Sequence, residues 1–172
     1  MITPKYIAMF RQGIANELQH ELVSTKKMLE KVPVDRLDWK PHEKSMSLGR
    51  LAGHIAEIWG WLTMTIKTDE LDLAAMNYQP PVINGTADLL SLLEKMNAEA
   101  IQAIQNASHE DLMKPWTLRR GDQTLMSMPK VAVIRSLAMN HLVHHRGQLS
   151  VYLRMLDIPV PGMYGPSADD RF

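Results

Sequence analysis

The chain has 172 residues, of which 45% are hydrophobic and 22% are charged, values typical of a globular protein that forms one domain over residues 1–172. Lys plus Arg and Asp plus Glu both number 19, so the formal net charge of +0 argues against nucleic-acid and anionic-membrane partners. The chain contains no Cys, so any metal must be held by nitrogen and oxygen atoms. With no secretory signal pattern and no run near the ~18 apolar residues of a membrane span, we expect a cytoplasmic protein.

Apolar residues recur at helical spacing from about Tyr6 to Lys31, which predicts a first helix that ends at Pro33. Residues 34–42 follow as an extended connection. Ser47 is then predicted to be the N-cap of a second helix that runs to about Thr65.

Residues 69–85 contain a Pro-Pro and an Asn-Gly pair, which predict a loop that could serve as a lid. Thr86 or Asp88 is predicted to cap a third helix that reaches about Asn106. Residues 116–125 alternate in character on either side of an Arg-Gly-Asp turn, and this pattern predicts a small β-hairpin.

A fourth helix is predicted from about Pro129, in its first turn, to Leu156. Residues 158–172 are too rich in Pro and Gly for a helix, but they include apolar side chains that favour a packed C-terminal strap over a solvated tail. Four long amphipathic helices predict an all-α four-helix bundle, with a small β-hairpin before the last helix and chemistry in the core or at one end of the bundle.

The histidines are the strongest functional signal. His141 and His145 are four residues apart, so both imidazoles lie on one face of the last helix and could bind one metal ion. His54, in the second helix, could supply a third imidazole, and three protein ligands would leave coordination positions open for water or substrate. The alternative is packing: seven histidines give roughly 0.3 such pairs by chance, and a single His54 is more often a hydrogen-bonded core residue.

Helical phase also assigns neighbours to these histidines. Gln148 and Tyr152 lie on the same face as the His141 and His145 pair. Arg146 lies about 140° away, and we expect it to make a structural ion pair or to take part in helix packing rather than to act in catalysis. Glu57 and Trp61 lie within about 60° of His54. We take Glu57 and Gln148 as candidate catalytic residues and Trp61 and Tyr152 as candidate pocket residues.

Three stretches resemble a known family. They are the last-helix sequence HLVHHRGQLSVYLR at residues 141–154, LAGHI at residues 51–55 and VPGMYGPSAD at residues 160–169. Together they resemble the DinB/YfiT-like metalloenzymes over nearly the whole chain. The resemblance implies a four-helix bundle that holds a divalent ion, zinc or nickel, through one histidine of the second helix and an i, i+4 pair of the last. In this sequence those ligands are His54, His141 and His145.

The resemblance leaves the reaction open, because the family includes thiol-dependent S-transferases, a thiol-dependent isomerase and proteins described as metal-dependent hydrolases. We expect an enzyme whose metal activates water or a low-molecular-weight thiol toward a small-molecule substrate. The alternatives are a non-catalytic metal- or ligand-binding stress-response protein, and a helical protein whose histidines only pack. The resemblance also implies a homodimer.

Overall fold

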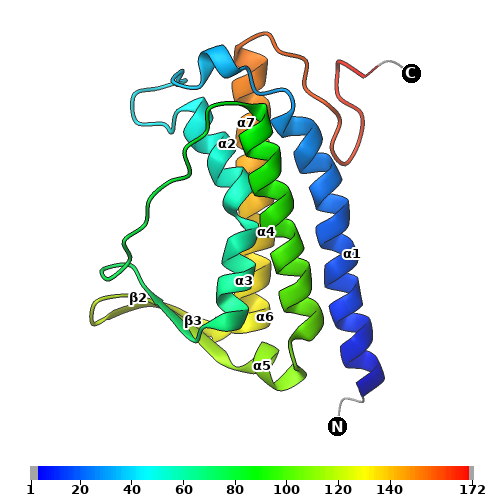
Figure 1. Cartoon of the computed structure of the whole chain (residues 1–172), viewed down its shortest axis with the longest axis vertical. Helices are drawn as coiled ribbons and strands as arrows, with labels where there is room; N and C mark the ends of the chain where they lie inside the picture. Colours follow the sequence, from blue (N-terminus) through cyan, green and yellow to red (C-terminus); the bar gives the residue numbers. More distant parts are fainter. Residues whose placement is uncertain (1–3, 171–172) are drawn as a thin grey trace.

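The computed structural model describes the backbone of residues 4–170 and the side chains of residues 8–170. Long helices run side by side along the longest axis of the molecule, and a small sheet lies near one end of them (Figure 1). The helices of the described chain are α1 (Pro4–Leu29), α2 (Leu48–Glu57), α3 (Trp59–Lys67), α4 (Thr86–Asn106), α5 (His109–Met113), α6 (Lys130–Val133) and α7 (His141–Met155). A short 3-10 helix, η1 (Val34–Arg36), follows α1, and a π-helical segment, η2 (Ile134–Asn140), joins α6 to α7.

The core lies between these helices. Leucines from four of them have no exposed surface: Leu18, Leu51, Leu93 and Leu149. Burial of a leucine side chain contributes roughly 1.5–3 kcal/mol, so the apolar stripes that predicted the helices also hold them together. Among the described residues, no helix combines the length and hydropathy that a membrane span requires.

The predicted second helix is two helices. Ser47 caps α2 as predicted, with its hydroxyl oxygen accepting the N–H of Arg50 at 3.2 Å. The helix is interrupted at Ile58, where the N–H of Trp61 bonds to the Ile58 carbonyl three residues back, and α3 then begins at Trp59. Apolar periodicity continues across this junction, so the pattern could not reveal it.

Helix α4 has the predicted extent, but its cap differs from the prediction. Gly85 is the N-cap residue and offers no side chain. Asp88, inside the first turn, reaches back to accept the N–H of Asn84 at 2.8 Å. The expectation that Thr86 or Asp88 would occupy the cap position is therefore wrong by one to three residues.

The chain is mostly helical, but it also contains a mixed three-stranded sheet. Strand β2 (Pro115–Arg120) pairs antiparallel with β3 (Gln123–Pro129), and the turn between them uses a positive φ of 56° at Gly121. Strand β1 (Glu70–Asp72) adds to β2 in parallel. The expectation of a four-helix bundle with an isolated hairpin is therefore too simple. It missed β1 because residues 69–85 were assigned entirely to a loop.

The described part of the C-terminal tail packs against the helices. Ile158, Val160 and Met163 contact the core cluster. The Asp169 carboxylate accepts the N–H of Val160 at 2.8 Å and pairs with Arg154 on α7 at 2.5 Å. These contacts fasten the tail over the end of the bundle that lies opposite the sheet (Figure 1).

Candidate metal centre

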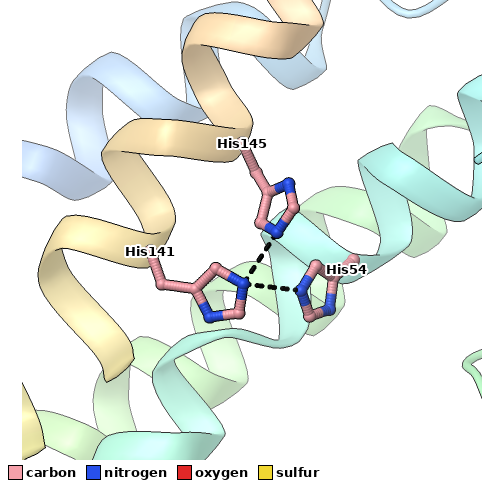
Figure 2. A group of neighbouring side chains, drawn as sticks. All are labelled: His54, His141 and His145. Carbon is pink, nitrogen blue, oxygen red and sulfur yellow. Dashed lines mark hydrogen bonds between the residues drawn. The ribbon is translucent and has the colours of Figure 1, made fainter. Parts of the chain in front are cut away.

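Three histidines converge between α2 and α7. Figure 2 shows His54 on one helix facing His141 and His145 on the other. The Nε2 atom of His141 lies 2.7 Å from Nε2 of His145 and 3.4 Å from Nε2 of His54. One nitrogen from each ring lies within 4.8 Å of the other two, close enough for all three to bind a single ion. The structure thus brings together the three residues that the sequence singled out.

The outer nitrogens of two of these rings face side-chain acceptors. The carboxylate of Glu57 lies 3.0 Å from Nδ1 of His54, and the carboxamide oxygen of Gln148 lies 2.7 Å from Nδ1 of His145. Hydrogen bonds of this kind fix the tautomer of a metal-binding histidine and orient its ring. Glu57 and Gln148, which we expected to be catalytic, therefore make contacts suited to positioning the histidines, and a direct catalytic role for either stays a prediction.

The third outer nitrogen faces a backbone carbonyl of the π-helical segment. Nδ1 of His141 lies 3.2 Å from the carbonyl oxygen of Leu137. In an α-helix that carbonyl would accept the backbone N–H of His141. Here the N–H of His141 bonds to Ala138 instead. The irregular turn thus makes the Leu137 carbonyl available to the imidazole.

These contacts decide what the cluster can hold. When each Nδ1 donates to its acceptor, each Nε2 carries a lone pair. Three lone pairs then face one another without a donor, an arrangement that repels by itself and that a shared cation stabilises. Imidazole nitrogen is a good ligand for zinc and nickel, so the residues fit a divalent transition-metal ion.

Burial favours the neutral, metal-binding form of two of these imidazoles, His141 and His145. His54 and His145 are only 8% and 7% exposed. Loss of solvation lowers the pKa of His145 to about 4 and lowers the pKa of His141, which the neighbouring His54 lowers further. At neutral pH, His141 and His145 therefore need to lose no proton before they bind an ion.

Glu57 belongs to a further polar network. It accepts the hydroxyl of Tyr78 at 2.5 Å and pairs with Arg50 at 3.3 Å, while Arg50 also donates to the Tyr78 hydroxyl. Burial raises the pKa of Glu57, but the hydrogen bonds from His54 and Tyr78 and the charge of Arg50 outweigh it, so the net pKa is lowered. Glu57 is therefore ionised beside His54. Arg50 lies one helical turn before His54 on α2, but nothing in the sequence indicated Tyr78.

Tyr78 lies in the long segment between β1 and α4, which runs past α2 and α3 (Figure 1). The same segment packs closely against α2 at Gly53. A Cβ there would lie 3.2 Å from Cγ1 of Ile83, so glycine allows the close approach. The segment predicted as a lid therefore lies against the helix that carries His54.

The two candidate pocket residues are in different places. The Trp61 ring meets the His141 ring edge-on, with centroids 6.1 Å apart, and Trp61 also lines a small cleft together with Glu57. Tyr152 packs instead against Trp39, with centroids 5.6 Å apart, and its hydroxyl donates to the Met46 carbonyl at 3.3 Å. The structure thus brings Trp61, but not Tyr152, into contact with the histidines.

Arg146 occupies the opposite side of α7 from the metal centre. Its guanidinium is 2% exposed and pairs with Glu21 of α1 at 2.6 Å. It also donates to the Thr25 hydroxyl at 3.1 Å and to the Tyr164 hydroxyl at 2.5 Å. The prediction of a structural ion pair for Arg146 is confirmed.

The mostly helical fold and the cluster of three histidines are typical of helical proteins that can hold a divalent ion. The sequence pattern of the DinB family matches residues 7–171. The chain therefore belongs to the DinB family.

Two proteins of Bacillus subtilis strain 168 are similar to this chain over most of its length. The uncharacterized protein YrdA is 27% identical over 161 residues, which cover 88% of this chain and 86% of YrdA. The uncharacterized protein YjoA is 29% identical over 145 residues, which cover 83% of this chain and 88% of YjoA.

Crystal structures support the fold. The DinB-like protein YjoA of Bacillus subtilis superposes with a TM-score of 0.65 at 23% identity, covering 86% of this chain and 96% of YjoA. A DinB-like protein from Bacillus cereus ATCC 10987 gives a TM-score of 0.67 at 24% identity, covering 89% of this chain and 97% of that protein. These superpositions establish a shared fold, and at this level of sequence identity they establish nothing further.

Proposed function

We propose that this chain is a metal-dependent enzyme in which His54, His141 and His145 hold one divalent ion, zinc or nickel. The observation that carries the proposal is that the two nitrogens of each imidazole ring face different partners. Each Nδ1 faces an oxygen acceptor, and the Nε2 atoms face one another. A cluster of histidines that served only for packing would gain nothing from three converging lone pairs.

A bound divalent ion lowers the pKa of water or of a low-molecular-weight thiol and so supplies a nucleophile at neutral pH. The residues of the chain provide its surroundings. Three protein ligands leave coordination positions open, Glu57 and Gln148 hold two of the rings, and Trp61 forms a wall beside them. The proposed reaction is of the hydrolase or thiol S-transferase type.

The cleft beside the cluster favours this enzyme over a non-catalytic protein that only stores a metal or a ligand. A structural site closes its coordination sphere with a fourth protein ligand. Here, among the described residues, the cluster that could hold a metal contains three histidines, and two residues that contact them, Glu57 and Trp61, also line a cleft. We propose that a small-molecule substrate reaches the ion from this cleft.

Elemental analysis of the untagged protein tests the metal site directly. We expect about one zinc or nickel ion per chain, and its loss in both His54→Ala and the His141→Ala/His145→Ala double variant. His20→Ala, which removes an exposed histidine of α1, is the matched control and should retain the metal. Removing one ligand should weaken binding about 100-fold or more, because structural zinc sites gain roughly 10–16 kcal/mol from a few ligands.

Retention of full metal affinity in His54→Ala would refute the ligand assignment. If the wild-type chain takes up no metal even after reconstitution, the non-catalytic alternative becomes the better interpretation. For protein that does bind metal, the dependence of turnover on added thiol separates a transferase from a hydrolase.

The homodimer is a further part of the proposal, and light scattering on the purified protein tests it.

A further inference from the structure

A small cleft adjoins the metal centre and shares two walls with it. It has a volume of about 150 Å³ and is lined by Glu57, Gly60, Trp61, Met64, Leu71 and Met76. Glu57 accepts a hydrogen bond from His54, and the Trp61 ring meets His141 edge-on. A molecule bound in the cleft would therefore lie against two residues that contact the histidines.

The lining of this cleft is mainly apolar. Trp61 and Met64 come from α3, while Leu71 comes from β1 and Met76 from the segment that follows it. All four side chains are half-buried, and none belongs to the hydrophobic core cluster or to the residues packed against it. Burial of exposed apolar surface is favourable, so the exposed parts of these side chains would stabilise an apolar group bound in the cleft.

Charge and size narrow what could bind there. Among the six lining residues Glu57 alone is ionised, and its carboxylate already accepts from Tyr78 and pairs with Arg50. An additional charge on the ligand would therefore find no free partner in the lining. A dry apolar cavity of about 150 Å³ is known to accommodate benzene, and methionine side chains adapt readily to such groups.

We infer that this cleft is the specificity pocket of the enzyme and binds a neutral, apolar substituent of about the size of a benzene ring. The inference rests on the proposed function, because the reacting end of the substrate is assigned to the ion that the three histidines hold. The substrate class is accordingly a small molecule in which a short apolar or aromatic group lies next to the atom that reacts.

The test uses the full chain loaded with cobalt(II), whose absorption reports a bound thiolate. Two thiols of similar acidity serve as probes, phenylmethanethiol and 2-mercaptoethanol, and their dissociation constants are read from the thiolate-to-cobalt band. We expect phenylmethanethiol to bind at least about tenfold more tightly, because even one methylene in an apolar pocket discriminates by about that factor.

Variants that fill the cleft should remove this preference. Met64→Trp should narrow the cleft from α3, and Met76→Trp should narrow it from the segment that follows β1. In either variant the ratio of dissociation constants should fall below about threefold. Met113→Trp is the matched control, because Met113 is 50% exposed on α5 and lies outside the lining. It should keep the wild-type ratio. Two filling variants on different elements guard against the misfolding of one.

The outcomes separate this inference from the function on which it rests. Cobalt binding with equal affinity for the two thiols, or a preference that survives in both filled variants, would overturn the specificity pocket and leave the metal site intact. A wild-type chain that binds no cobalt would overturn the metal site, and the specificity pocket with it.

Discussion

His145 and Arg146 are adjacent in the sequence, and each belongs to a buried polar cluster on its own side of α7. On the Arg146 side the guanidinium pairs with Glu21 and also donates to the hydroxyls of Thr25 and Tyr164. On the His145 side, three Nε2 atoms converge, and the outer nitrogens are the ones that face oxygen acceptors.

The difference shows how a structural cluster can be told from a functional one. The Arg146 cluster matches a positive charge with a negative one, as a buried ion pair requires, and it fastens α7 to α1 and to the tail. The histidine cluster has no such counter-charge, and in the proposed function a cation joins it. Burial alone does not distinguish the two, since Arg146 and His145 are both buried, at 2% and 7% exposure.

Removing one partner of the Arg146 ion pair should have the largest effect. Glu21→Ala leaves the guanidinium buried without its counter-charge, and such changes cost about 3–5 kcal/mol. We expect urea denaturation to report a loss of this size in the free energy of unfolding. The matched control is Glu17→Ala, on the same helix, whose partner Arg135 is half exposed and whose loss should cost less than about 1 kcal/mol.

The same variant tests whether the two sides of α7 have separate roles. Folded Glu21→Ala protein at low temperature should still bind about one metal ion per chain, because the Glu21 carboxylate is paired with Arg146 and Tyr164 on the other side of α7. Loss of metal from protein that remains folded would mean that the Arg146 cluster also positions the histidines.

A smaller effect is expected from the carboxylate behind His54. Glu57→Ala removes the acceptor of the Nδ1 proton and should weaken zinc binding about 10- to 100-fold, as is usual for such outer partners. Competition with a chromophoric chelator measures the change. Glu94→Ala removes an exposed carboxylate that pairs with Lys26 and should leave zinc affinity unchanged. Equal affinities in the two variants would show that Glu57 does not support His54.

The smallest effect should come from the loop. Tyr78→Phe removes the hydroxyl that donates to Glu57 but keeps the ring that lies 5.5 Å from the Arg50 guanidinium. A partly exposed hydrogen bond contributes about 0.5–1.5 kcal/mol, so thermal unfolding should shift by only a few degrees. Zinc affinity should change less than in Glu57→Ala. A larger loss of affinity than in Glu57→Ala would place Tyr78 itself at the metal centre.

Helical phase accounts for the part of the site that the sequence could predict. His141, His145 and Gln148 share one face of a single uninterrupted helix, so a helical wheel is enough to group them and to place Arg146 on a different face. The link from α2 to α7 could not be obtained in this way, because periodicity says nothing about which helices are neighbours. The resemblance to the DinB family supplied that link for His54.

The missed features depend on contacts between distant parts of the chain. Strand β1 is three residues long and forms by pairing with β2, where Arg119 bridges the carboxylates of Glu70 and Asp72. Three residues carry no reliable alternation pattern, so their strand character could not be inferred locally. Tyr78 joins the Glu57 network from a loop of irregular backbone, for which the sequence offers no periodic signal at all.

The π-helical segment also has a consequence for changes in chain length. A π-helical turn holds more residues than an α-helical turn, so it accommodates an additional residue while both flanking helices keep their positions. Each residue advances an α-helix by about 100°, so deleting one residue from 134–140 would force a choice. Either the histidine face turns away from α2, or α6 turns relative to β3. The length of this segment, rather than the identity of each residue in it, therefore fixes the direction in which the histidine face of α7 points.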